Sequence, residues 1–280
     1  MSQFTVLLTV YLRDNGEWFS RALDSIYFSQ IRKPDEIVIV ADGELSEDLE
    51  SVLSSFSLMV NHSREIVKIF RLPENYGLGY ALSYGLDFCS GDYVARMDAD
   101  DISLESRFLR QFNFLDENPH IDILGSASYE IDQFGEIIGQ RAVPSSHHEI
   151  IALLWTCPII HPTVVFRKSL VESVGAYSKK LKRRQDYDLW FRCAIKGATF
   201  ANLDTPCLQY RVTSESYTRK KIIDSWRQAI IGLKGSMALS LGFKAYVGVF
   251  FPFLKCLLPM PIRRKIDMMM ARFDPRGGWE

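Results

Sequence analysis

The sequence predicts an α/β protein built on a mostly parallel central sheet that is flanked by helices. In the first part of the chain, short apolar runs rich in Val and Ile alternate with segments whose apolar residues recur at helical spacing. Strands connected by helices pair in parallel and bury both faces, so each run is apolar almost throughout. The runs occupy residues 4–11, 36–42, 66–72 and 93–98, and the helical segments occupy residues 18–29, 46–57 and 78–89.

Beyond residue 101 the order of strand-like and helical segments becomes mixed. A turn at Gln133, Phe134 and Gly135 separates two strand-like runs and is typical of a hairpin. In chain order the pattern predicts a helix at 108–115, strands at 121–131 and 136–142, a helix at 148–155, a strand at 163–167 and a helix at 186–196, and residues 199–212 close this region.

The C-terminal part is helical in pattern and unusually apolar. A helix is predicted at 222–241, and the apolar stretch 245–262 that follows contains Pro252, Lys255 and Pro259. A membrane-spanning helix needs about 20 apolar residues with few charges, so a span is not expected here. Two alternatives stay open. The segment lies in the interface of an anionic membrane, next to the basic residues 263–265, or it packs on the protein's own core as a helical hairpin.

Composition excludes several classes of function. The chain has 280 residues, 47% of them apolar, and a net charge of -1, which predicts a large globular core and no nucleic-acid partner. Its five cysteines are scattered without CxxC spacing, which argues against a zinc site or a disulfide framework. The N-terminal residues lack the features of a signal peptide, so we expect a cytoplasmic location.

The most informative segment is the end of the strand at 93–98, where Asp98, Asp100 and Asp101 follow closely on one another. In a strand, residues two apart share a face, and two neighbouring carboxylates repel unless a proton or a metal ion lies between them. Oxygen ligands alone suit Mg²⁺ or Mn²⁺ that also binds substrate phosphates. Capping of the next helix is the alternative, but it explains only one of the three acids.

Polar residues follow each of the four predicted parallel strands. Tyr11 follows the first, Asp42 the second, Asn75 and Gly77 the third, and Asp98 the fourth. Ligands of such sheets bind beyond the carboxyl ends of the strands. An aromatic ring there can stack on a base, and an acid can accept hydrogen bonds from a base or ribose. Together these residues predict a site for a nucleoside diphosphate.

Five segments in series resemble the signature blocks of family 2 glycosyltransferases, which have the GT-A fold and invert the sugar that they transfer. They are Val10-Tyr11, Val40-Ala41-Asp42-Gly43, Glu74-Asn75-Tyr76-Gly77-Leu78-Gly79, Ala95-Arg96-Met97-Asp98-Ala99-Asp100-Asp101 and Arg184-Gln185-Asp186-Tyr187-Asp188-Leu189-Trp190. The resemblance covers residues 4–212. It implies a catalytic domain at 1–215, with a nucleotide-binding half at 1–101 and an acceptor half at 102–215, followed by a helical segment at 216–280.

The resemblance also implies a role for each residue of the donor site. Tyr11 would lie by the uracil and Asp42 would contact uracil or ribose, while Asn75 and Gly77 would line the nucleotide pocket. Asp98 would reach the ribose or the metal, and Asp100 would bind the metal that holds the diphosphate. Arg96 would neutralise phosphate or pair with a nearby aspartate.

Asp186 matches the acid of the last block and would be the general base. The family block usually has Glu before this aspartate, and here Gln185 takes that place. Spacing alone does not separate Asp186 from Asp188, because on a helix these positions do not share a face. His161 would contact the metal, the diphosphate or the acceptor, or it would be a structural histidine.

The resemblance implies an inverting transfer, dependent on Mn²⁺ or Mg²⁺, from a UDP-sugar to a lipid-linked oligosaccharide. The chain is similar to bacterial enzymes of O-antigen, capsule and exopolysaccharide assembly. The resemblance therefore implies a protein bound peripherally to the inner face of the cytoplasmic membrane. Galactose is the first expectation for the sugar, then N-acetylglucosamine and glucose. A sugar-1-phosphate nucleotidyltransferase would need a Gly-rich basic loop near residues 11–15, which the sequence lacks. A non-catalytic binding protein would not need Asp186.

Overall fold

The four expected parallel strands form one half of a nine-stranded sheet in this computed structural model, which describes residues 2–62, 64–213, 222–259, 262–263 and 265–266. They are β1 (Phe4–Val10), β2 (Glu36–Ala41), β3 (Val67–Arg71) and β4 (Tyr93–Met97). They pair in parallel in the order β3-β2-β1-β4. Val10 lies opposite Ala41, and Leu8 lies opposite Met97, so the carboxyl ends of these strands share one edge.

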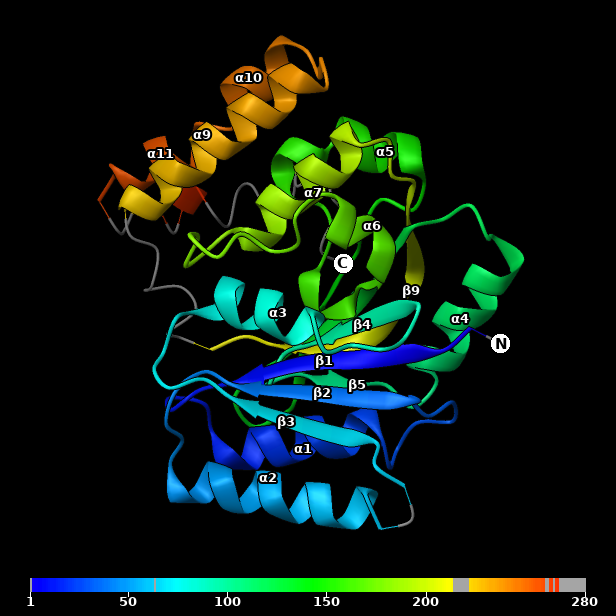
Figure 1. The fold of residues 1–280 in the computed structure, drawn as a ribbon. Coiled ribbons are helices and arrows are strands. Elements are labelled where there is room, and N and C mark those ends of the chain that lie inside the picture. Colours follow the sequence, from blue (N-terminus) through cyan, green and yellow to red (C-terminus); the bar gives the residue numbers. More distant parts are fainter. Residues whose placement is uncertain (1, 63, 214–221, 260–261, 264, 267–280) are drawn as a thin grey trace.

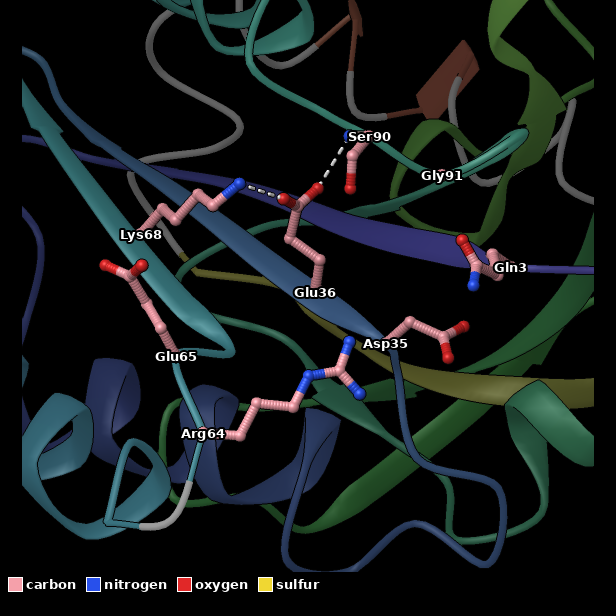
Figure 2. Close-up of a pocket in the computed structure, with 8 residues that line it drawn as sticks. All are labelled: Gln3, Asp35, Glu36, Arg64, Glu65, Lys68, Ser90 and Gly91. Atoms are coloured by element: carbon pink, nitrogen blue, oxygen red, sulfur yellow. Dashed lines mark hydrogen bonds and ion pairs between the residues drawn. The ribbon is translucent and has the colours of Figure 1, made fainter.

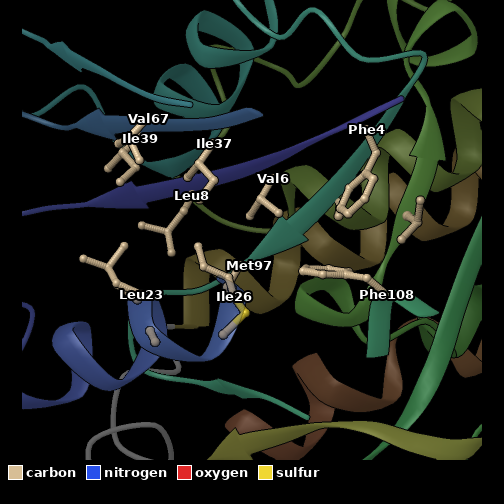
Figure 3. Packing of buried hydrophobic residues seen from close by; sticks show 14 of the residues in the cluster. Phe4, Val6, Leu8, Leu23, Ile26, Ile37, Ile39, Val67, Met97 and Phe108 are labelled. Carbon is tan, nitrogen blue, oxygen red and sulfur yellow. The ribbon is translucent and has the colours of Figure 1, made fainter. Parts of the chain in front are cut away.

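Helices cover both faces of these strands (Figure 1). α1 (Gly16–Ile26) and α2 (Glu47–Val60) lie on one face, and α3 (Leu78–Leu86) lies on the other. Alternate strand residues serve the two sides: Val6 and Ile39 pack with the first two helices, whereas Leu7 and Val38 pack with α3. Figure 3 shows the first of these clusters, in which Leu23 and Ile26 of α1 approach the strands.

The second half of the sheet is mixed. β8 (Val165–Arg167) pairs antiparallel with β4 and β6 (Ile123–Ile131), and β9 (Phe200–Arg211) runs parallel to β6. β7 (Ile137–Arg141) forms the expected hairpin with β6. A two-residue strand, β5 (Ile102–Ser103), pairs with β9 and was not predicted, because two residues are too few to show a period.

Four helices and two short 3₁₀ turns complete this half. They are α4 (Arg107–Glu117), α5 (His147–Ala152), α6 (Lys168–Ser173), α7 (Gln185–Ile195), η1 (Leu154–Thr156) and η2 (His161–Thr163). The helix predicted at 148–155 is therefore shorter and ends in the turn η1. The short helix α6 was not predicted. Trp190 and Phe191 of α7 are buried in the core, as is usual for large apolar residues inside a helix face.

The C-terminal helices pack on α7. α9 (Ile222–Ala238) crosses it, and α10 (Phe243–Gly248) and α11 (Phe251–Cys256) return along α9. Figure 1 shows the three helices on the far side of α7 from the parallel strands. No helix in the described residues is long and apolar enough to cross a membrane. The expected helix at 222–241 is present, and the stretch from 245 onward is broken into short helices.

Candidate active site

The loop after β3 is fastened to the end of β2 by Asp42. The Tyr76 amide donates to Oδ1 of Asp42 (2.8 Å), and the Gly77 amide donates to Oδ2 (2.9 Å). The Asn75 side chain donates to the carbonyl oxygen of Asp42 (3.2 Å). Burial raises the pKa of Asp42, and the two amide hydrogen bonds act in the opposite direction. Three of the expected nucleotide-site residues are thus assembled into one wall.

Gly77 has a backbone angle φ of 92°, which favours glycine. It immediately precedes α3, so the loop turns directly into that helix. At the neighbouring strand, the Tyr11 amide donates to Oδ2 of Asp14 (2.9 Å), which turns the chain after β1. Tyr11 is half-buried and lies beside Asp42 along the edge, because Val10 and Ala41 are paired.

Asp98, Asp100 and Asp101 form the turn after β4. Asp98 is partly exposed and pairs with Arg96, whose side chain is fully buried. Burial, followed by the Asp98 charge, raises the pKa of Asp100 to about 6. Asp101 is buried: its Oδ1 accepts from the Arg211 amide (2.8 Å), and its Oδ2 has no hydrogen-bond partner among the described residues. Carboxylate oxygens are the donors that Mn²⁺ and Mg²⁺ prefer, so Asp98 and Asp100 are the two acids of this turn that would suit either ion together with substrate phosphates.

Arg96 takes one of its two expected roles, because it pairs with an aspartate rather than reaching the donor phosphates. A direct contact with the donor phosphates requires an accessible guanidinium, and here it lies beneath the turn. Its Nη1 donates to the carbonyl oxygen of Leu7 (3.4 Å), and its Nη2 pairs with Asp98. The reason is that Arg96 is the fourth residue of β4, in the interior of the sheet. It is placed to act through Asp98, the second of the two expected roles.

Asp186 lies in the first turn of α7, where the positive end of the helix dipole favours an acid. Burial is the first cause that raises its pKa, and the Asp98 charge raises it further, whereas Arg184 lowers it. The segment before Asp186 also meets the start of α3, because a Cβ atom at Gly79 would lie 3.3 Å from Cβ of Gln185. Asp188 pairs instead with Arg192 (2.8 Å), so the structure distinguishes two acids that spacing left equivalent.

His161 is buried, and its contacts are with other side chains of the core. Its Nε2 forms a hydrogen bond with the Tyr177 hydroxyl (2.9 Å), and its ring meets the Trp190 ring edge-on. Burial lowers the pKa of His161 well below its usual range, so the ring is neutral. Within the part of the chain that the structure describes, no three His, Cys, Asp or Glu side chains are grouped so that they could hold a metal. His161 is therefore not assembled with Asp98 and Asp100 as a third ligand.

A polar pocket lies at the amino-terminal ends of the parallel strands (Figure 2). At its centre, Glu36 accepts hydrogen bonds from Lys68 (2.6 Å), the Thr5 hydroxyl (2.6 Å) and the Ser90 amide (2.7 Å). These groups satisfy one another, and Glu36 is the first residue of β2 rather than the last. The pocket is thus separate from the edge that carries the predicted nucleotide site.

Comparisons with known proteins show the family to which the chain belongs. Residues 5–175 match the model of the family described as glycosyl transferase family 2. The chain belongs to glycosyl transferase family 2. Among its relatives, the glycosyltransferase is similar to the amylovoran biosynthesis glycosyltransferase AmsE of Erwinia amylovora, with 34% identity over 78% of this chain and 79% of that protein.

The glycosyltransferase is also similar to a protein of Escherichia coli named UDP-Gal:alpha-D-GlcNAc-diphosphoundecaprenol beta-1,3-galactosyltransferase. The identity is 32%, over 78% of this chain and 77% of that protein. Among solved structures, TarS 1-349 of S. aureus in complex with UDP-GlcNAc superposes with a TM-score of 0.69. The match has 16% sequence identity and spans 97% of this chain and 80% of the TarS chain. The GT-A fold expected from the sequence is confirmed.

Arg211 is a site residue that sequence reasoning missed. Its Nε donates to the carbonyl oxygen of Asp100 (2.8 Å), its Nη1 donates to that of Asp132 (2.8 Å), and its guanidinium lies 4.7 Å from the centre of the Trp18 ring. It fixes the acidic turn against the last strand and α1. No spacing rule identifies it, because its partners come from three distant parts of the chain.

Proposed function

We propose that this glycosyltransferase moves a sugar from a UDP-sugar to a hydroxyl of a lipid-linked oligosaccharide, with inversion at the anomeric carbon. The observation that carries the proposal is the contact between the start of α3 and the segment that leads into Asp186, where a Cβ atom at Gly79 would lie 3.3 Å from Cβ of Gln185. This contact supports a base near the carboxyl edge of the parallel strands, where a diphosphate would bind, and the raised pKa of Asp186 suits that role. Nucleotide binding alone would not require Asp186.

The donor site is proposed from the four strand ends. Tyr11 stacks by the uracil, and the wall made by Asp42, Asn75 and Gly77 lines the nucleotide pocket. Asp98 and Asp100 hold Mn²⁺ or Mg²⁺, with Arg96 beneath Asp98 as a positioning residue. When bound, the divalent ion supplies Lewis-acid stabilisation of the charge that develops on the diphosphate. His161 has a structural role in this proposal, because its Nε2 is hydrogen-bonded to the Tyr177 hydroxyl.

In the proposed reaction, Asp186 accepts the proton of the acceptor hydroxyl as that oxygen attacks the anomeric carbon. The new carbon–oxygen bond forms as the bond from the anomeric carbon to the β-phosphate oxygen breaks. The bonding electron pair leaves with UDP, and the proton stays on the Asp186 carboxyl. A single displacement inverts the configuration, so an α-linked donor gives a β-linked product.

The similar proteins support the choice of substrates. The name of one relative specifies UDP-Gal and an acceptor on diphosphoundecaprenol, and another relative is named for polysaccharide biosynthesis. A protein of the same fold is described with UDP-GlcNAc. We therefore place galactose first, then N-acetylglucosamine and glucose, and place the reaction in surface polysaccharide assembly at the inner face of the cytoplasmic membrane. Residues 1–101 would form the donor half, 102–215 the acceptor half, and 216–280 the helical appendage.

A transfer assay with matched variants tests the function. UDP-galactose, UDP-N-acetylglucosamine and UDP-glucose are each offered with Mn²⁺ and a GlcNAc-diphospho-lipid acceptor, and product is measured by chromatography. We expect Asp186→Asn to lose at least about 100-fold in turnover, which is the usual contribution of a general base. Asp188→Asn is the control, because it removes an acid of the same helical turn whose carboxylate pairs with Arg192.

The two variants separate the outcomes. Loss in Asp186→Asn with activity kept in Asp188→Asn supports the assignment of the base. Full turnover in Asp186→Asn would show that the base is another residue. UDP binding by the wild-type chain without transfer from any of the three donors would favour a binding protein.

A further inference from the structure

The C-terminal helices are seated on α7 through small residues. A Cβ atom added at Gly235 would lie 2.2 Å from the Phe191 ring, and one at Gly232 would lie 2.5 Å from the Tyr187 hydroxyl. Gly248 approaches Trp155 as closely, since a Cβ there would lie 2.3 Å from the indole. This close packing uses one face of α9 and one face of α10. It joins the appendage to the helix that carries Asp186.

The opposite face of α10 and α11 is apolar and exposed. Phe243, Val247, Phe251 and Leu254 are 80%, 54%, 38% and 54% exposed. They are spaced four, four and three residues apart, so they form one stripe along the helices. Ala245, Val249 and Cys256 are buried and lie on the other side. One apolar face of these helices is thus buried against the protein, and the other apolar face is available to contact a second apolar environment.

α9 extends this exposed stripe. Ile222, Trp226 and Met237 are exposed on it, and the Trp226 ring meets Phe250 and Phe253 at centroid distances of 6.0 and 5.0 Å. We call the combined area the C-terminal apolar surface, made of Ile222, Trp226, Met237, Phe243, Val247, Phe251, Leu254 and Leu257. Ten of the twenty exposed large apolar side chains in the described residues lie in 222–262, so the concentration here is not the ordinary surface scatter.

The charge of this part of the chain is strongly positive. Residues 222–266 contain seven Lys and Arg residues and one acidic residue, whereas the whole chain has a net charge of -1. The acidic residue, Asp224, lies 3.6 Å from Arg183 and is already paired. Arg227, Lys234 and Lys244 are exposed beside the apolar stripes. A basic margin around aromatic and aliphatic side chains complements anionic lipid headgroups over an apolar layer.

We infer that the C-terminal apolar surface is the membrane-contact surface of this protein and lies in the headgroup region of an anionic bilayer. This inference rests on the proposed function in one respect, namely that the acceptor sugar is linked to a membrane lipid. A second copy of the chain fits less well, because a two-fold contact through this surface would bring the basic margin of one copy, with Arg227, Lys234 and Lys244, against the same basic margin of the other. Since α9 packs on α7, membrane contact would fix Asp186 relative to the lipid that carries the acceptor.

Vesicle flotation of the full chain tests this surface without any sugar transfer. Vesicles of phosphatidylcholine mixed with phosphatidylglycerol are compared with vesicles of phosphatidylcholine alone. We expect binding to the mixed vesicles that weakens as salt is added, because the charge contribution is screened. Phe243→Ser with Val247→Ser should reduce the ratio of bound to free protein roughly tenfold, since two exposed apolar side chains no longer enter the bilayer.

Two further variants make the test specific. Lys234→Glu with Lys244→Glu should reduce binding to the mixed vesicles only, by removing the charge contribution. Phe134→Ser with Ile138→Ser is the matched control, because these side chains are also exposed, at 73% and 56%, but lie on the β6–β7 hairpin. Unchanged UDP binding in all variants shows that the fold and the donor site are intact, so failure of this inference is separable from failure of the proposed function.

Three results would overturn the inference. One is equal vesicle binding by wild type and Phe243→Ser with Val247→Ser. Another is no binding of the wild type to either vesicle. The third is a wild-type dimer, measured by light scattering, that dissociates in the same double variant, which would assign the surface to a second copy of the chain.

Discussion

Opposing electrostatic effects act on the pKa of Asp186, and this pKa determines its strength as a base. Burial and the Asp98 charge raise its pKa, and the Arg184 charge lowers it. A carboxylate with a raised pKa holds a proton more readily, so it is a stronger base once it is ionised. Arg184 has a backbone angle φ of 63°, which holds it immediately before α7 and close to the acid that it influences.

Removing the Arg184 charge is predicted to shift the pH profile in a defined direction. The base must be ionised to accept a proton, and without Arg184 the pKa of Asp186 rises further above its usual range. The acidic limb of kcat/KM therefore moves to higher pH in Arg184→Asn, and activity at a pH on that limb falls. Asparagine is chosen because it tolerates a positive φ. The measurement is kcat/KM against pH, and Lys180→Gln, an exposed charge loss in the same loop, should leave the limb in place.

An acidic limb that moves to lower pH in Arg184→Asn, or one that moves equally in Lys180→Gln, would contradict the role given to Asp186.

At this scale the sequence indicates the acids more readily than their neighbours. Asp100 and Asp186 stand in recognisable blocks, and the structure places Asp100 in the turn after β4 and Asp186 in the first turn of α7, while their roles stay predictions. Arg96 was predicted as a residue of the site, but its complete burial depends on strand packing. Arg211 could not be predicted, because its hydrogen bonds to Asp100 and Asp132 join residues 111 and 79 positions away in the chain.

Among the elements, α3 and the segment before α7 determine how the two halves of the site meet. A Cβ atom at Gly79 would lie 2.6 Å from the carbonyl oxygen of Ser178 and 2.8 Å from that of Leu181. It would also lie 3.3 Å from Cβ of Gln185. The start of α3, which follows the Gly77 loop, is therefore in direct contact with the chain that leads to Asp186. Glycine is needed here for space rather than for its backbone angle.

Gly79→Ala should force these elements apart. The clash is with backbone atoms, so we expect a cost of about 1–3 kcal/mol in the free energy of unfolding, as for overpacked sites. We also expect a higher KM for the donor, because the Gly77 loop moves with α3. Urea unfolding and donor kinetics measure the two effects.

Gly16→Ala is the matched control at the start of α1. Its added Cβ would meet only the carboxylate of Asp48, which is an exposed side chain that can swing away. We expect unfolding stability equal to or above that of the wild type there, since Ala favours a helix. Equal stability of Gly79→Ala and Gly16→Ala would show that the contact between α3 and the 178–185 segment is not tight.

The sequence pattern predicted the order of the longer strands and helices, but it did not predict the short elements β5 and α6. Hydrophobic periodicity indicated the four parallel strands to within one or two residues of their ends, because strands buried on both faces leave a strong signal. β5 and α6 are set by pairing with β9 and by the turn after β8, which no local period records. The strand expected at 93–98 ends at Met97, since Asp98 begins the acidic turn.

For the whole molecule, the fold places two kinds of surface around one site. The parallel strands share a carboxyl edge, where we propose that the donor binds, and α7 packs against α9 of the C-terminal helices (Figure 1). The positive charge of the C-terminal part is offset elsewhere in the chain, so the net charge of -1 conceals a strong asymmetry. Sequence pattern left open whether these helices pack on the core or meet a membrane, and the structure shows a packed face together with an exposed apolar one.

The measurement that tests the central claim most directly is thermal unfolding with UDP, with and without Mn²⁺, for the wild type and for Asp100→Asn and Asp186→Asn. A ligand at one hundred times its dissociation constant stabilises the folded state by about 2.7 kcal/mol, a shift of a few degrees at this chain length. We predict a shift for the wild type and Asp186→Asn that needs both UDP and Mn²⁺, and a much smaller one for Asp100→Asn. No shift with UDP and Mn²⁺ together, or an equal shift in Asp100→Asn, would contradict the account.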